Sequence, residues 1–232
     1  MEFLTKVALA FEHGGIWMWP ILVLQLISIA ILIERTLFLF RKRQSNQMAL
    51  INSFEDHVRR GEMNEVVRKA QELKAVSPVA RAIAAGATAA ASFGGKEEIQ
   101  GKMDEVLLHE NSLLDKRTGF LSMLGNVATL TGLLGTISGM IASFAAVAQA
   151  NPAEKAALLS AGISEAMNCT AYGLIVAIPA LVAFSFLQNR ANHLSDDLNQ
   201  AALKAFNWLT YNYEPITQKS AQPSVRPTEI NV

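Results

Sequence analysis

The chain has 232 residues and a formal net charge of zero at pH 7, and 51% of its residues are hydrophobic while 17% are charged. This balance of charge gives no reason to expect nucleic acid as a partner. The single cysteine, Cys169, cannot form a disulfide within the chain, and no Cys/His spacing of a metal site occurs. Because the apolar residues are gathered in blocks, the composition predicts an all-α membrane protein with a soluble helical part.

The first predicted span covers residues 16–40. Residues 1–15 ahead of it form a short amphipathic segment that we expect outside, at the membrane interface. Trp17 and Trp19 stand where an aromatic belt lies, and a basic run begins at Arg41, so the positive-inside rule places the N-terminus outside and Arg41 in the cytoplasm. A cleaved signal peptide has the opposite order of charge and apolar run. Glu34 and Arg35, at the cytoplasmic end of this span, are interpreted as structural.

Residues 41–118 are predicted to form a cytoplasmic helical region. Helices are expected over 48–60 and 62–74, and Ser77-Pro78 is typical of a cap and first turn that open the next helix. Between Gly95 and Ala150 the sequence offers no stop other than glycines that membrane helices tolerate. We therefore expect one rod of more than 50 residues, about 80 Å long at 1.5 Å per residue, that joins this region to the second span.

The second span, predicted over residues 119–150, carries two regular patterns. Small residues recur at steps of three and four, on one helix stripe of the kind through which membrane helices pack closely. Hydroxyl residues recur every seven residues beside that stripe. Such hydroxyls often bond the carbonyl four residues earlier, but four in register favour a face turned toward neighbouring helices or water. The small residues are Gly125, Ala128, Gly132, Gly135, Gly139, Ala142 and Ala146, and the hydroxyl residues are Ser122, Thr129, Thr136 and Ser143.

Residues 158–189 are predicted to form the third transmembrane helix. A second small-residue stripe runs along it, and Glu165, Asn168, Cys169 and Tyr172 lie on the flank of that stripe. The stripe consists of Gly162, Ala166, Thr170, Gly173 and Ala177. Pro179 has no N–H to donate and is predicted to kink the helix.

The connections on either side of the third span differ in character. Residues 151–157 are predicted to form a short outside loop in which Asn151-Pro152 reads as a cap and first turn, so the helix starts near Pro152. Residues 190–214 are expected to continue into the cytoplasm as an amphipathic helix. Residues 215–232 are rich in Pro, Gln, Ser and Thr and are predicted to be disordered.

Glu165 is the leading candidate for chemistry. It lies among small residues in an apolar run long enough to cross a bilayer, where an ionisable side chain costs roughly 2.5–3.5 kcal/mol on insertion scales. Such a group is expected to face protein or water and to serve a function. The alternative is a buried contact to a neighbouring subunit. A nucleophile with a base, paired catalytic acids and metal ligands are lacking in the sequence, so we expect neither an enzyme nor a cofactor.

These segments resemble the ExbB/TolQ/MotA proton-channel family. The resemblance rests on LLGTISGM at 133–140, GISEA at 162–166, TAYGL at 170–174 and AIPA at 177–180, and it extends to residues 15–37 and the three-span layout. Three spans with a short outside N-terminus resemble the ExbB/TolQ branch. The resemblance implies a homopentamer in the bacterial inner membrane around the single helices of a dimeric ExbD- or TolR-like partner that carries a membrane aspartate. In that family, proton passage turns the partner to drive TonB-dependent uptake, Tol-Pal work or gliding, so a TonB- or TolA-like protein is a further expected partner.

By position in those motifs, Glu165, Thr136 and Thr170 match the family's polar pore-facing residues. The chain departs from the family where Thr129 replaces a usual proline, and where Asn168 and Tyr172 replace apolar residues. These extra polar groups leave sodium open as the ion. The resulting hypothesis is a stator whose second and third helices line a narrow conduit, packed through Gly132, Gly135, Gly139, Gly162 and Gly173. The alternatives are a passive membrane scaffold that anchors an envelope complex and a sodium-driven form of the same motor.

Overall fold

The computed structural model describes residues 15–42, 47–60, 62–75, 77–92 and 95–211. The predicted N-terminal segment, apart from Gly15, and the predicted tail over 215–232 lie outside these residues. The described chain is helical and contains no strand, and three of its helices are long and apolar enough to cross a membrane. The predicted all-α fold with three spans is confirmed.

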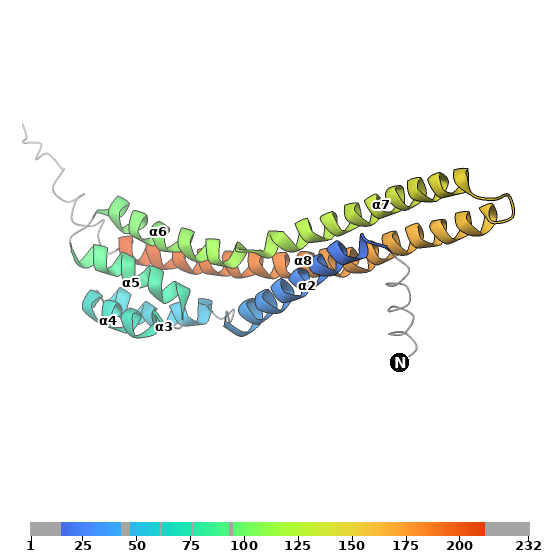
Figure 1. Ribbon diagram of the computed structural model, residues 1–232. Helices are drawn as coiled ribbons and strands as arrows, with labels where there is room; N and C mark the ends of the chain where they lie inside the picture. The colour runs from blue at the N-terminus through green and yellow to red at the C-terminus, as the bar shows by residue number, and fades with distance from the viewer. Residues whose placement is uncertain (1–14, 43–46, 61, 76, 93–94, 212–232) are drawn as a thin grey trace, which may run out of the picture. The chain divides into compact units, whose positions relative to one another are not determined.

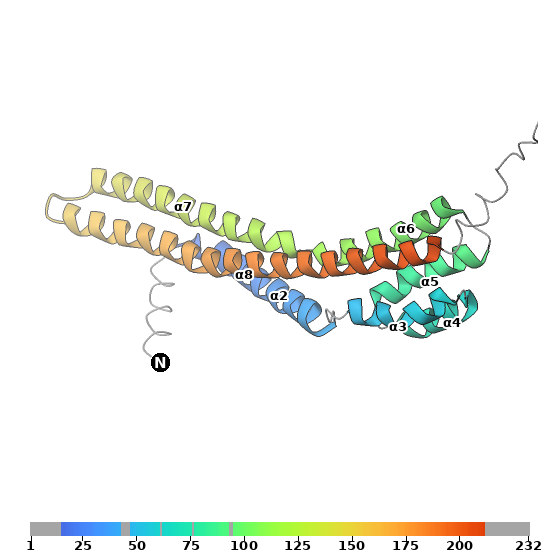
Figure 2. The same cartoon turned by 180° about the vertical axis from the view of Figure 1, so that it is seen from behind.

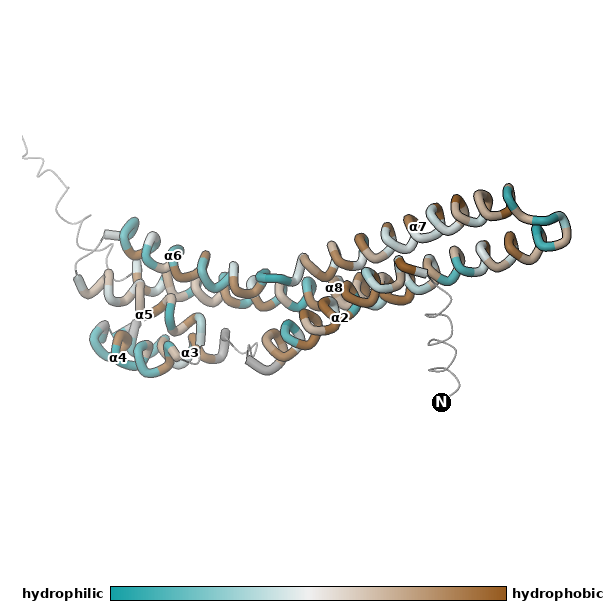
Figure 3. Tube along the Cα trace, viewed as in Figure 1, coloured by the Kyte–Doolittle hydropathy of each residue, from teal (hydrophilic) through white to brown (hydrophobic). Residues whose placement is uncertain are grey.

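The chain divides into two compact units, which are described separately. The membrane unit comprises residues 1–43 and 115–191, and its helices are α2 (Met18–Leu37), α7 (Thr118–Gln149) and the first part of α8 (Lys155–Tyr211). A π-helical turn, η1 (Phe38–Lys42), follows α2. Within this unit α7 runs alongside α8 in both views of the molecule (Figures 1 and 2). Colouring by hydropathy shows that apolar residues dominate these helices (Figure 3).

The second unit contains α3 (Gln47–Arg59), α4 (Met63–Leu73), α5 (Pro78–Ala91), α6 (Lys96–Asp115) and the final part of α8. The start of α5 is the predicted one: Ser77 is the N-cap, its side chain accepts a hydrogen bond from the Ala80 N–H at 3.4 Å, and Pro78 occupies the first turn. The core joins large side chains from all five helices, including Phe54, Ile83, Met103 and Leu209.

An ion pair also lies in the second unit, on the apolar face of α6. Glu110 is 1% exposed, and its Oε1 lies 3.1 Å from Nε of Arg81 in α5. Leaving a buried carboxylate without a partner is costly, so this pair ties α5 to α6.

The expected single rod from Gly95 to Ala150 is wrong, because the helix is interrupted between Asp115 and Thr118. Arg117 adopts the left-handed conformation, with φ of 63°. A non-glycine residue there costs about 1–2 kcal/mol. In this conformation the Arg117 guanidinium reaches both carboxylate oxygens of Glu34, at 2.7 and 2.8 Å. The ion pair therefore offsets part of the strain at the break.

The connection between α7 and α8 is short. The backbone N–H of Glu154 donates to the carbonyl of Asn151 at 3.0 Å, and residues 152–154 form a turn. The third helix thus begins at Lys155 rather than near Pro152. From Lys155, α8 continues to Tyr211 with Pro179 inside it.

Candidate functional site

Glycines bring the backbones of α7 and α8 close together. A Cβ at Gly132 would lie 3.2 Å from the carbonyl oxygen of Cys169, and a Cβ at Gly173 would lie 2.8 Å from that of Ala128. A Cβ at Gly139 would meet Ala166 at 3.1 Å. At Gly132 and Gly173 the atoms met are backbone atoms of the opposite helix, which cannot move aside as a flexible side chain can, so a larger residue there requires the helices to move apart.

Two further glycines lie against side chains of the opposite helix. A Cβ at Gly162 in α8 would overlap the hydroxyl of Ser143, and one at Gly135 in α7 would overlap the Cys169 sulfur. The five glycines singled out in the sequence thus all lie at the contact between α7 and α8.

The hydroxyls of Thr136 and Thr170 meet at this contact. Thr136 Oγ1 touches Thr170 Oγ1 and also lies 3.2 Å from the Gly132 carbonyl oxygen. Thr170 Oγ1 lies 3.0 Å from that same carbonyl oxygen. Each hydroxyl has one proton to donate and two lone pairs that accept. After both protons are donated, acceptor capacity remains for water or for a protonated carboxyl group.

Two other hydroxyl residues of the predicted face, Thr129 and Ser143, bond within their own helix. Thr129 donates to the Gly125 carbonyl at 3.1 Å, and Ser143 donates to the Gly139 carbonyl at 2.7 Å. This is the local bonding pattern of membrane Ser and Thr. Of the four hydroxyls in register, Thr136 is therefore the one for which the structure shows a hydroxyl partner on the opposite helix.

Glu165 lies on a different side of α8 from Thr170. Residues Ala166, Thr170, Gly173 and Ala177 follow at steps of four, three and four and contact α7. The neighbouring stripe faces α2: Glu165 approaches the Cα of Gly15, Cys169 and Val176 pack with Met18 and Ile21, and Tyr172 donates to Gln25. At about 100° per residue, Glu165 and Thr170 are about 140° apart around the helix and about 7.5 Å apart along it.

The structure thus brings Thr136 and Thr170 together and places Glu165 beside the start of α2. The Glu165 side chain is exposed in the single chain, and Asn168 is half-buried. A carboxylate beside the N-terminal end of a helix interacts favourably with the helix dipole. The facing hydroxyls therefore lie at the boundary of α8 with α7, whereas the carboxylate lies at its boundary with α2.

Sequence reasoning missed Gln25. This residue stands in an apolar run, but it belongs to a stripe of α2 that recurs at steps of three and four through Met18, Ile21, Ser28 and Arg35. Those four residues are buried. A polar residue on such a stripe signals a partner on a facing helix, so the spacing was enough to single out Gln25, although not to identify its partner.

The charges at the end of α2 are paired, as their structural interpretation requires. Glu34 binds Arg117, and Nε of the buried Arg35 donates to Thr118 Oγ1 at 3.4 Å. These contacts join the end of α2 to the start of α7. They satisfy charges that would otherwise be costly at the end of a span.

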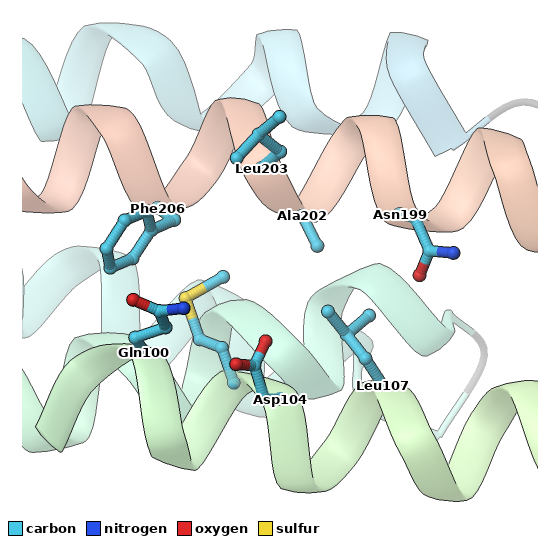
Figure 4. A pocket seen from close by; sticks show the side chains of 8 residues that line it. Gln100, Asp104, Leu107, Asn199, Ala202, Leu203 and Phe206 are labelled. Carbon is cyan, nitrogen blue, oxygen red and sulfur yellow. The ribbon is translucent and has the colours of Figure 1, made fainter. Parts of the chain in front are cut away.

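A groove lies between α6 and α8 within the second unit (Figure 4). Its volume is about 330 Å³, and Met103, Leu107 and Phe206 supply much of its apolar lining. Asp104 is the charged residue among those that line it. The groove offers a surface for apolar contact rather than a route for ions. Across the described residues, no three His, Cys, Asp or Glu side chains are grouped as a metal site requires.

The fold and these sites define a multi-pass helical membrane protein in which a glycine-packed helix pair carries facing hydroxyls. The sequence profile of the MotA/TolQ/ExbB proton channel family matches residues 63–200. The chain belongs to this family.

Individual relatives carry names from the ExbB/TolQ branch. The chain is 27% identical over 130 residues to the biopolymer transport protein ExbB of Salmonella typhimurium, which covers 56% of this chain and 53% of that protein. It is 35% identical over 95 residues to the Tol-Pal system protein TolQ of Haemophilus influenzae, covering 41% of each. It is 30% identical over 175 residues to a putative ExbB-like protein of Synechocystis, covering 73% of this chain and 79% of that one. The matches thus span about half the length or less of the Salmonella and Haemophilus proteins.

Proposed function

We propose that the chain is the stator and channel subunit of an ExbB–ExbD- or TolQ–TolR-like motor in a bacterial inner membrane. In this proposal several copies, five by analogy with the family, surround the single membrane helices of a partner that carries a membrane aspartate. The proton motive force drives the partner, which then acts on a TonB- or TolA-like protein. The N-terminus lies in the periplasm and the C-terminus in the cytoplasm.

The observation that carries the proposal is the hydroxyl pair of Thr136 and Thr170. The two residues lie in the family's matched region, face each other across α7 and α8, and share the Gly132 carbonyl as an acceptor. Their remaining lone pairs suit them to accept a hydrogen bond from a water chain or from the partner's carboxyl group.

Glu165 takes a separate role from the threonines. Because it lies five residues nearer the predicted outside end of the third span than Thr170, on the stripe of α8 that faces α2, we assign it to the entry of the conduit, where it concentrates cations before they reach Thr170. About 7.5 Å of helix separates the two residues, a gap that water or a partner side chain bridges. Asn168 and Thr129 add polar groups near this route.

The membrane potential supplies enough energy to bias rotation of the partner. A unit charge that crosses 100 mV releases about 2.3 kcal/mol, which biases rotation between nearly equivalent positions. Away from the helix ends, Glu165 is the one carboxylate in the three predicted spans. A second protein is therefore needed to supply the acid that is alternately protonated and released.

The test uses inverted membrane vesicles from a bacterial host that expresses the full chain together with the product of its neighbouring reading frame. A trapped pH-sensitive dye reports proton flux. Thr170→Val keeps the shape of the side chain but removes its hydroxyl, and Glu165→Gln removes the charge. We expect each to lower proton flux at least about tenfold, equivalent to about 1.4 kcal/mol, while cross-linking shows unchanged assembly.

Ser185→Ala is the matched control, because the exposed Ser185 hydroxyl donates to the Leu181 carbonyl of its own helix at 3.2 Å. We expect wild-type flux from this variant. Normal flux from both Thr170→Val and Glu165→Gln would remove these residues from the mechanism. An intact assembly without flux would favour the passive scaffold, and flux that follows a sodium gradient would favour the sodium-driven form.

A further inference from the structure

A hydrogen bond joins α2 to α8 within a largely apolar contact. The Tyr172 hydroxyl donates to Oε1 of Gln25. Around this bond the contact consists of buried apolar residues, among them Met18, Ile21 and Val176. Neither polar group belongs to the route proposed for ions, and the membrane surroundings offer no bulk water to replace the bond.

The Gln25–Tyr172 bond and the contact with α7 lie on different sides of α8. Tyr172 lies on the stripe of α8 that faces α2, whereas Thr170, two residues earlier, lies on the stripe that faces α7. Cys169 lies between the two stripes, because it packs with Met18 and Ile21 and also against Gly135. Two polar contacts on different sides therefore define the rotation of α8 about its own axis.

We propose that Gln25 and Tyr172 are positioning residues: their hydrogen bond sets the rotation of α8 and thereby holds the Thr170 hydroxyl against Thr136. The consequence for ions rests on the function proposed above, but the positioning itself does not. Neither residue needs to touch the ion.

The geometry of a helix shows why the bond matters. With its side chains, a helix has a radius of about 5–6 Å, so a turn of about 20° moves a side-chain tip by about 2 Å. A hydrogen bond does not survive a lengthening of that size. The close contact with α7 lies on one side of α8, so the Gln25–Tyr172 bond adds a constraint from a second side, and the two together set the angle.

The test measures the approach of positions 136 and 170 directly. In a full-length Cys169→Ala background, Thr136→Cys and Thr170→Cys are introduced together, and the rate of disulfide formation under a mild oxidant is followed in membranes. Adding Tyr172→Phe, which removes only the hydroxyl, is expected to lower this rate about threefold, the factor equivalent to about 0.6 kcal/mol for an interhelical hydrogen bond in a membrane.

Gln25→Leu provides a second variant that removes the same bond from the other side. We expect the same decrease, and no further decrease when it is combined with Tyr172→Phe, because both remove one interaction. Ser185→Ala is expected to leave the rate unchanged. The proposal would be overturned if both single variants formed the disulfide as fast as the chain without them. It would also be overturned if the two losses multiplied in the double variant, or if Ser185→Ala lowered the rate equally.

Ion flux separates this proposal from the function on which its consequence rests. In chains with native Thr136 and Thr170, Tyr172→Phe is expected to lower proton flux about threefold, in step with the cross-linking rate. If the wild type conducts no ions but cross-linking still depends on Tyr172, the positioning role stands and the proposed function fails. If ions flow and neither measurement responds to Tyr172→Phe, the positioning role fails and the proposed function stands.

Discussion

In the membrane unit, α7 meets α8 through glycine backbones, whereas in the second unit the helices meet through large apolar side chains. A Cβ at Gly132 or Gly173 would lie only 3.2 or 2.8 Å from a backbone oxygen of the facing helix, while Phe54 and Leu209 are 1% exposed and fill the space between their helices. The two units thus achieve close helix contact by different means within one chain.

The difference follows from the solvent that each set of helices meets. In water, apolar side chains are driven together, at roughly 25 cal/mol per Å² of buried apolar surface. In lipid this force is absent between helices, because the acyl chains are as apolar as leucine. Helices there associate through close backbone approach and polar contacts, which is the role of the glycines and of bonds such as Gln25–Tyr172 in this chain. Truncating large residues should therefore damage the second unit most, and enlarging small residues should damage the membrane unit most.

The largest effect is expected from Phe54→Ala in the second unit. Phe54 is 1% exposed, and the substitution should lower the free energy of unfolding of that unit by about 3–5 kcal/mol. Hydrogen exchange of the α3 to α5 amides, followed by mass spectrometry on the detergent-solubilised chain, measures the loss. Leu130→Ala truncates a residue of the membrane unit that is 63% exposed and should leave exchange near wild type. Equal losses in the two variants would contradict the contrast between the units.

Gly173→Val tests the opposite substitution and should have the next largest effect. The new side chain would meet the Ala128 carbonyl and the Gly132 Cα, so α7 and α8 must separate. We expect a loss of about 1–3 kcal/mol, visible as faster exchange in both helices and a lower melting temperature in detergent. Gly119→Ala is the matched control, since a Cβ at Gly119 meets nothing within 4 Å. If Gly173→Val had the same melting temperature as Gly119→Ala, close backbone approach would not be what stabilises the contact between α7 and α8.

Features that depend on local spacing could be predicted from the sequence. The helix start at Ser77-Pro78 was one such feature, because a cap and its first turn are adjacent in the chain. The small-residue stripes of α7 and α8 were another, since a period of three and four residues defines a helix face without reference to the rest of the fold.

Features that depend on distant partners could not be predicted in this way. The break before Thr118 involves Arg117 and Glu34, which are 83 residues apart, and the bond between Gln25 and Tyr172 spans 147 residues. Periodicity showed that Glu165 and Thr170 lie on different stripes of one helix. It did not show which neighbouring helix each stripe faces, and this assignment separates the carboxylate from the hydroxyl pair.

The smallest change in stability is expected at the break between α6 and α7. There the left-handed backbone of Arg117 destabilises the fold, while the ion pair of its side chain stabilises it. Arg117→Gly removes the ion pair with Glu34 but also relieves the left-handed backbone, so the two changes should nearly cancel, to within about 1 kcal/mol. Arg117→Ala removes the same ion pair and keeps the strain, so it should be the less stable of the two. Melting temperatures in detergent rank the variants, and Glu34→Gln isolates the ion pair. If Arg117→Ala were as stable as Arg117→Gly, the left-handed residue would carry no strain, and the ion pair alone would account for the break.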